Sequence, residues 1–175
     1  MRMEILLGDI TKQDVDAIVN AANPSLLGGG GVDGAIHAAA GTGLRDECEA
    51  VRASQFPDGL PTGAAVATNA GRLPSRVVIH TVGPRHWEHP DGGVDLLASC
   101  HTEALRIASS MGLRSVAFPA ISCGVYGWSV TDAAPIAVRS VRQFDVDHVG
   151  HGIELVRFVL FSDDAHTAFA AHATR

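Results

Sequence analysis

The chain has 175 residues and a mass of 18.2 kDa, which fits one domain with a substantial core. Hydrophobic residues make up 46% of the sequence but aromatic residues only 5%, so Ala, Val, Leu and Ile must build most of the core. The formal charge is −6 and no two basic residues are adjacent. This balance argues against extended contact with RNA or another nucleic acid, although a small anion held by backbone donors stays compatible with it.

The sequence also limits compartment and cofactors. No segment is long and apolar enough for a signal peptide or a membrane span, so we expect no contact with membranes. Cys48, Cys100 and Cys123 are odd in number and widely spaced, which is typical of a reducing cytosol and predicts a cytoplasmic protein. The nine histidines include no His-Glu-x-x-His motif, and we expect neither a metal site nor a cofactor.

Hydrophobic periodicity predicts an alternation of strands and helices. In chain order we expect a strand at 3–7, a helical turn at 11–14, a strand at 16–20, helices at 31–40 and 43–53, strands at 64–68 and 76–82, a helix at 94–111, a strand at 115–119, a helix at 131–144, a strand at 154–161 and a helix at 163–172. Thr131 or Asp132 is expected to cap the helix at 131–144.

This alternation predicts an α/β fold, in which helices cover both faces of the sheet. The run at 76–82 is almost continuously apolar, as expected for a strand covered on both faces. No repeat or linker divides the chain, so we predict a single domain over residues 1–175. Ligands of such folds bind at the carboxyl ends of the strands, where both glycine-rich loops of this chain lie.

The segment 20–37 is the most informative part of the sequence. It places two amides, four consecutive glycines and the carboxylate of Asp33 between a strand and a helix. Glycine N–H groups and a helix N-terminus suit a phosphate, while a carboxylate beside them suits hydroxyl groups or a water. A phosphorylated sugar is therefore the expected ligand. Gly29, Gly31 and Gly34 match the dinucleotide pattern GxGxxG, but the glycines do not closely follow the first strand and no acidic residue ends a following strand.

A second loop, residues 118–128, follows the strand at 115–119 and contains a hydroxyl, a thiol, two glycines and two aromatic residues. Together with the first loop it can clamp a diphosphate, with Tyr126 covering a sugar ring. The alternative is an ordinary strand-to-helix turn with a buried aromatic residue. Cys123 has no Cys-His motif and Ser122 no GxSxG elbow, so neither is favoured as a nucleophile.

Five segments together carry a family resemblance: 8–11, 18–23, 26–37, 79–84 and 117–127. In these residues the chain resembles the macrodomain family, and within it the MacroD-type branch, which binds ADP-ribose and removes it from modified proteins or from O-acetyl-ADP-ribose. The resemblance implies a three-layer α/β/α domain with a mixed central sheet. Ala38 and Cys123 depart from it, since relatives carry Arg and Thr or Ser at these positions.

The resemblance also implies roles for individual residues. Asp9 would accept a hydrogen bond from the adenine amino group, with Ile10 and Phe161 beside the base. The diphosphate would lie between two sets of residues: Gly30, Gly31 and Val32 on one side, and Ser122, Cys123, Gly124, Val125 and Tyr126 on the other. The resemblance further implies that Asn23 holds the distal ribose and that Asp33 lies near the ribose carbon that bears the leaving group.

The carboxylate of Asp33 has three interpretations. Its place in the first helical turn predicts a lowered pKa and a weak base that orients water, while a substrate phosphate oxygen takes the proton. Asp33 itself is the other candidate base, and a purely stabilising first-turn acid is the non-functional reading. The identity of the base stays open at this point.

We therefore predict a metal-free hydrolase that removes mono-ADP-ribose from acidic side chains, deacetylates O-acetyl-ADP-ribose, or does both. The expected partners are ADP-ribose, ADP-ribosylated proteins and O-acetyl-ADP-ribose, and the expected state is a monomer. The alternative is a non-catalytic module that reads ADP-ribose. The presence of both Asn23 and Asp33 favours the enzyme, since a reader needs only the clamp.

Overall fold

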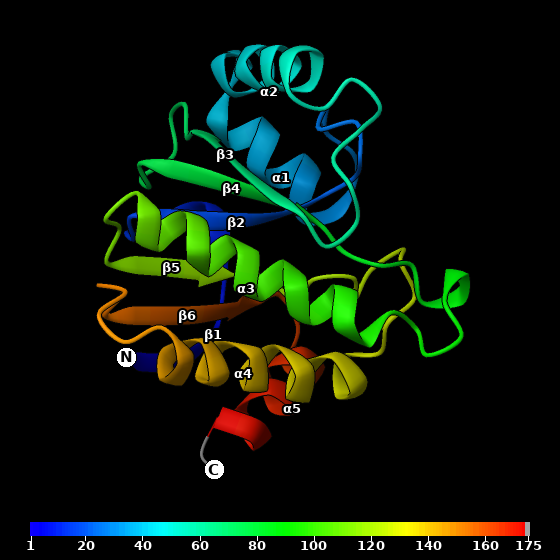
Figure 1. Ribbon diagram of the computed structural model, residues 1–175, viewed down its shortest axis with the longest axis vertical. Coiled ribbons are helices and arrows are strands. Elements are labelled where there is room, and N and C mark those ends of the chain that lie inside the picture. Colours follow the sequence, from blue (N-terminus) through cyan, green and yellow to red (C-terminus); the bar gives the residue numbers. More distant parts are fainter. Residues whose placement is uncertain (174–175) are drawn as a thin grey trace.

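A computed structural model describes residues 1–173, whose strands form a six-stranded sheet between two layers of helices (Figure 1). The strand order is β1-β6-β5-β2-β4-β3. Neighbouring strands run parallel, except that β3 is antiparallel to β4, so the sheet is mixed as the family resemblance implied. The strands are β1 (Arg2–Leu7), β2 (Ala17–Ala22), β3 (Ala65–Asn69), β4 (Val77–Val82), β5 (Ser115–Phe118) and β6 (Leu155–Leu160).

The helices begin and end within a few residues of their predicted bounds. They are α1 (Gly31–Ala40), α2 (Thr42–Ser54), α3 (Val94–Ser110), α4 (Val130–Asp147) and α5 (Asp163–Ala173), with short 3-10 turns at Ile10–Lys12 and His86–Glu88. The predicted cap of α4 was wrong. Ser129 caps this helix instead, because its hydroxyl accepts a hydrogen bond from the N–H of Asp132 at 3.1 Å.

The two faces of the sheet are covered by different helices. α1 and α2 lie over one face, and α3, α4 and α5 lie over the other (Figure 1). Successive strand residues alternate between the two layers: Ile18 packs under α1 and α2, whereas Ala17 and Val19 pack on the opposite side. This explains the continuous apolar run in β4, since a strand buried on both faces needs apolar residues in both directions.

The parallel strands end at one edge of the sheet, and this edge gathers the predicted loops. Residue 9 follows β1, residues 23–30 follow β2, residues 119–128 follow β5 and Phe161 follows β6. These segments are remote in sequence but become neighbours because the strands before them are paired in parallel. In residues 1–173 we find no helix that is both long enough and apolar enough to cross a membrane.

Candidate active site

The glycine-rich loop leads directly into α1. Gly30 is the cap residue of this helix, and no side chain of the described residues caps it. The first N–H groups of α1 are therefore open to an anion at the positive end of the helix dipole. Gly34 lets the helix approach the loop, because a Cβ at this position would lie 2.5 Å from the carbonyl oxygen of Gly29.

Asn23 is held by its own loop. Its side-chain oxygen accepts hydrogen bonds from the N–H and hydroxyl of Ser25, and its amide nitrogen donates to the carbonyl of Gly28 at 3.0 Å. Asn23 Nδ2 and Asp33 Oδ2 each lie 3.2 Å from the point where a Cβ on Gly29 would stand. The absence of a side chain at Gly29 thus leaves a space that both the amide and the carboxylate border.

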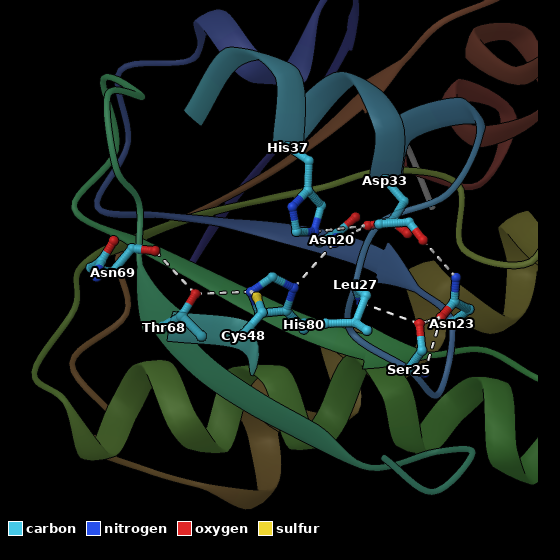
Figure 2. A network of polar contacts seen from close by, with 11 residues as sticks. Asn20, Asn23, Ser25, Leu27, Asp33, His37, Cys48, Thr68, Asn69 and His80 are labelled. Carbon is cyan, nitrogen blue, oxygen red and sulfur yellow. Dashed lines mark hydrogen bonds and ion pairs between the residues drawn. The ribbon is translucent and has the colours of Figure 1, made fainter. Parts of the chain in front are cut away.

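Asp33 lies in the first turn of α1 and is only 4% exposed. Its Oδ1 accepts a hydrogen bond from Asn20 Nδ2 at 2.8 Å and lies 3.5 Å from His37 Nε2 (Figure 2). Burial raises the pKa of Asp33, outweighing the lowering effects of the Asn20 hydrogen bond and of His37. The predicted lowering of this pKa was therefore wrong, because desolvation of the buried carboxylate is the largest influence on it.

Asn20, His37 and His80 also lie at this site, although none was a predicted site residue. His37 stands one helical turn after Asp33, on the same side of α1, and this i,i+4 spacing was the available signal. Asn20 lies in the middle of an apolar strand and is completely buried, so its amide needs partners within the fold. A polar side chain inside an apolar strand is the sequence feature that could have identified Asn20.

The loop after β5 is shaped by a close contact. Ser122 has a φ of 66°, a left-handed conformation that is uncommon for a residue with a side chain. A Cβ on Gly83 would lie 2.0 Å from Ser122 Oγ, so glycine is required at position 83 for the loop to sit where it does. Within the described residues, the N–H groups of Gly124, Val125 and Tyr126 have no protein acceptor, which leaves three consecutive donors for an anion.

Cys123 turns inward in this loop. Its N–H donates to the carbonyl of Ala120 at 3.3 Å, a long hydrogen bond that occupies the donor. Burial raises the pKa of its thiol to about 12. The thiol therefore stays protonated, in agreement with the prediction that it is not a nucleophile.

Tyr126 is supported by a neighbouring loop. The guanidinium of Arg85 lies 5.2 Å from the centre of its ring, and its carbonyl accepts a hydrogen bond from the N–H of His86 at 2.9 Å. The side chain is half-buried, so one part of the ring remains available for contact.

The opposite end of the loop cluster contains Asp9, Ile10 and Phe161. Asp9 Oδ1 accepts hydrogen bonds from the N–H and hydroxyl of Thr11 at 2.9 and 2.7 Å. The hydroxyl bond is the main cause that lowers the pKa of Asp9, so this carboxylate is ionised and an acceptor. Ile10 is buried, whereas Phe161 is 94% exposed and open to a flat partner.

Comparison with known proteins identifies this arrangement. The sequence pattern of the Macro domain family matches residues 19–137. The chain belongs to the macrodomain family. It is 56% identical over 166 residues to a Macro domain-containing protein of Streptomyces nogalater, covering 95% of this chain and 88% of that protein. It is 50% identical over 164 residues to a protein of Escherichia coli named O-acetyl-ADP-ribose deacetylase, covering 93% and 90% of the two chains.

The fold of this macrodomain also matches solved structures. A macrodomain of Oceanobacillus iheyensis, solved with ADP, aligns with a TM-score of 0.93 at 44% identity, covering 98% of this chain and 90% of that one. Ala38, one departure from the family pattern, is exposed on α1 and therefore changes the surface of this macrodomain. Among residues 1–173, no three His, Cys, Asp or Glu side chains are grouped so that they can hold a metal ion.

Proposed function

We propose that this macrodomain is a metal-independent hydrolase of ester-linked ADP-ribose. It deacetylates O-acetyl-ADP-ribose and removes mono-ADP-ribose from the acidic side chains of modified proteins. The single observation that carries the proposal is the buried carboxylate of Asp33, which borders the same space beside Gly29 as the amide of Asn23. The name of the E. coli relative supports the same chemistry.

The open backbone donors suit the diphosphate of the ligand. One phosphate binds at the start of α1, next to Gly30, Gly31 and Val32, where no side chain of the described residues competes for the N–H groups. The other lies against residues 122–126, where three consecutive N–H groups are free of protein acceptors in the described structure. Two donor sets at one edge of the sheet fit a diphosphate better than a single phosphate.

The adenine binds at the end of the site formed by Asp9, Ile10 and Phe161. Thr11 occupies Asp9 Oδ1, so Oδ2 is the oxygen that accepts from the exocyclic amine of the base. The exposed ring of Phe161 covers one face of the adenine. The distal ribose then lies beside Asn23, with Tyr126 packed against the sugar.

Hydrolysis needs one water and one proton acceptor. Asp33 Oδ2 orients the water and takes one of its protons while the water oxygen attacks the ester. One ester C–O bond breaks, and Asp33 then passes this proton to the departing oxygen, which regenerates the carboxylate. The products are a carboxylic acid, released as carboxylate, and the free hydroxyl of ADP-ribose. The raised pKa of Asp33 makes it a stronger base than an ordinary aspartate, which favours it over a substrate phosphate oxygen.

We also propose that a single domain over residues 1–175 performs this reaction as a monomer in the cytoplasm. Its predicted site residues come from one chain and meet at one edge of one sheet. The three cysteines are all free, in keeping with a reducing compartment.

The test measures acetate release from O-acetyl-ADP-ribose and ADP-ribose release from a glutamate-modified protein, with a chelator present. Asp33→Asn is expected to reduce turnover by about 10²- to 10⁴-fold while leaving ADP-ribose binding measurable. Asp132→Asn is the matched control, because Asp132 is an exposed acid in the first turn of α4. Binding without release by the natural protein would contradict the enzyme and indicate a reader module.

A further inference from the structure

A line of buried polar side chains runs away from Asp33 under α1 and α2 (Figure 2). Asn20 Nδ2 lies 2.8 Å from Asp33 Oδ1 and 3.1 Å from His80 Nδ1. His80 Nε2 lies 2.9 Å from Thr68 Oγ1, and Thr68 Oγ1 donates to the carbonyl of Asn69 at 3.0 Å. Asn20, Thr68 and His80 are buried, so the hydrogen-bonded atoms of their side chains depend on one another for partners, while Asn20 Oδ1 has none among the described residues.

The register of the sheet creates this line. Asn20 of β2 is the direct partner of His80 in β4, so their side chains emerge side by side. Thr68 of β3 lies two positions along from Val66, the residue that faces His80, and therefore emerges on the same side. The chain of contacts thus crosses three adjacent strands.

The direction of each hydrogen bond follows from the last group in the line, the carbonyl of Asn69. A backbone carbonyl only accepts, so the Thr68 hydroxyl gives its hydrogen to Asn69 and accepts from His80 Nε2–H. Burial lowers the pKa of His80 to about 3, so the ring is neutral and holds one hydrogen. That hydrogen is on Nε2, which leaves Nδ1 free to accept from the Asn20 amide nitrogen.

We propose that His80 and Thr68 are positioning residues, which hold the amide nitrogen of Asn20 toward Asp33 and so support the ionised form of this carboxylate. The inference rests on the proposed function of Asp33. With both hydrogens of Asn20 Nδ2 engaged, the amide presents a donor to the carboxylate. A flipped amide would place its oxygen against the negative charge instead.

The opposite arrangement belongs to protonated Asp33. Its O–H donates to Asn20 Oδ1, which also accepts from His80 once the ring hydrogen has moved from Nε2 to Nδ1. The Thr68 hydroxyl then turns from Asn69 toward Nε2. In this state the Asn20 amide has flipped, Asp33 has taken one proton from the solvent, and the ring has exchanged its hydrogen on Nε2 for one on Nδ1 and stays neutral. Because this state loses the bond to the Asn69 carbonyl, that bond favours ionised Asp33.

Three other titratable groups lie near this line. His37 on α1 lies 3.5 Å from Asp33 and its ring centre 6.3 Å from that of His80. On α2, Cys48 Sγ lies 3.6 Å from His80 Nε2, but burial raises the pKa of the thiol to about 12, so it stays neutral. Glu47 holds the N–H of Asn69 at 2.9 Å and steadies the peptide at the end of the line.

The first measurement is the tautomer of His80 by nitrogen NMR of the natural protein. We expect the hydrogen on Nε2, and a hydrogen on Nδ1 would overturn the inference. This readout does not depend on catalysis, so it tests the inference even if the protein proves to release no acetate.

The second measurement compares Thr68→Val, Thr68→Ser and Cys48→Ala. Removing the hydroxyl leaves His80 Nε2–H without its acceptor, so Thr68→Val is expected to move the acid limb of the kcat profile upward by roughly 0.5–1 pH unit, with little change in KM. Thr68→Ser keeps the hydroxyl and is expected to show the same pH profile of kcat as the natural protein. Cys48→Ala, which alters the other neighbour of Nε2, leaves it in place.

Carbon NMR of the Asp33 carboxyl in the same variants gives its pKa directly, without turnover. The same upward shift is expected in Thr68→Val alone. An unchanged pKa of the Asp33 carboxyl in folded Thr68→Val, or an equal pKa shift in Cys48→Ala, would contradict the inference. If the natural protein releases neither acetate nor ADP-ribose but the pKa of Asp33 shifts in Thr68→Val, the proposed function is refuted and the inference about His80 and Thr68 still holds.

Discussion

Two buried histidines lie on opposite faces of the sheet, and they differ in their partners. His80 lies under α1 and α2 with polar contacts at both ring nitrogens. His101 of α3 contacts the carbonyl of Leu97 through Nδ1 at 2.9 Å, and its Nε2 has no partner in the described residues. Its ring centre lies 5.3 Å from that of Phe118 and 6.2 Å from that of Phe158.

Burial lowers the pKa of both rings, to about 3 for His80 and about 4 for His101. Both are therefore neutral at physiological pH, and titration alone does not distinguish them. The difference lies in what each ring connects. His80 links strands to the candidate catalytic carboxylate, whereas His101 packs among aromatic residues as part of the core. Burial keeps both histidines neutral, and their hydrogen-bond partners determine the role of each.

The largest expected difference between the two histidines is in turnover. His80→Leu removes the acceptor that holds the Asn20 amide toward Asp33, so the amide can turn and kcat should fall about 10- to 100-fold. His101→Leu removes a ring without a link to Asp33 and should change kcat less than about twofold. Acetate release by both variants, with folding checked by circular dichroism, measures the difference. Equal losses would break the distinction between the two faces.

The pH dependence of stability should be similar for the two histidines. Each folded pKa lies below the ordinary value of 6.5, so unfolding takes up a proton between pH 6.5 and about 4 for His101, or about 3 for His80. Stability is thus full above pH 6.5 and falls as the pH decreases. Each leucine variant should reduce this slope by up to about 1.4 kcal/mol per pH unit, measured by urea unfolding. An unchanged slope in either variant would show that its ring is already charged.

The smallest effect concerns the carboxylate on the polar face. The pKa of Asp33 is raised above 3.8, so the folded state holds this proton more tightly and loses stability as pH rises through that pKa. Asp33→Asn should therefore raise the free energy of unfolding at pH 7 by about 0.5–2 kcal/mol, with a smaller gain near pH 3. Thermal unfolding at both pH values checks this. The same gain at both values would mean that charge burial is not the cause.

Much of the architecture was predictable because its causes are local. Apolar periodicity located the strands and helices, and the alternation of the two implied a sheet covered on both faces. The cap of α4 was missed because several polar residues at its start compete, and only the geometry chooses Ser129. The roles of Asn23 and Asp33 in substrate turnover remain predictions, as does each proposed contact with ADP-ribose.

The sequence by itself determined the family, the order of elements and the glycine-rich loop that opens the start of α1, because these depend on residue type and spacing along the chain. Only the tertiary structure decided the raised pKa of Asp33 and its line to Asn20, His80 and Thr68. Burial depends on which helix covers the carboxylate, and the line depends on the register of three strands. Both are set by contacts between segments that are distant in the chain, so no local pattern encodes them.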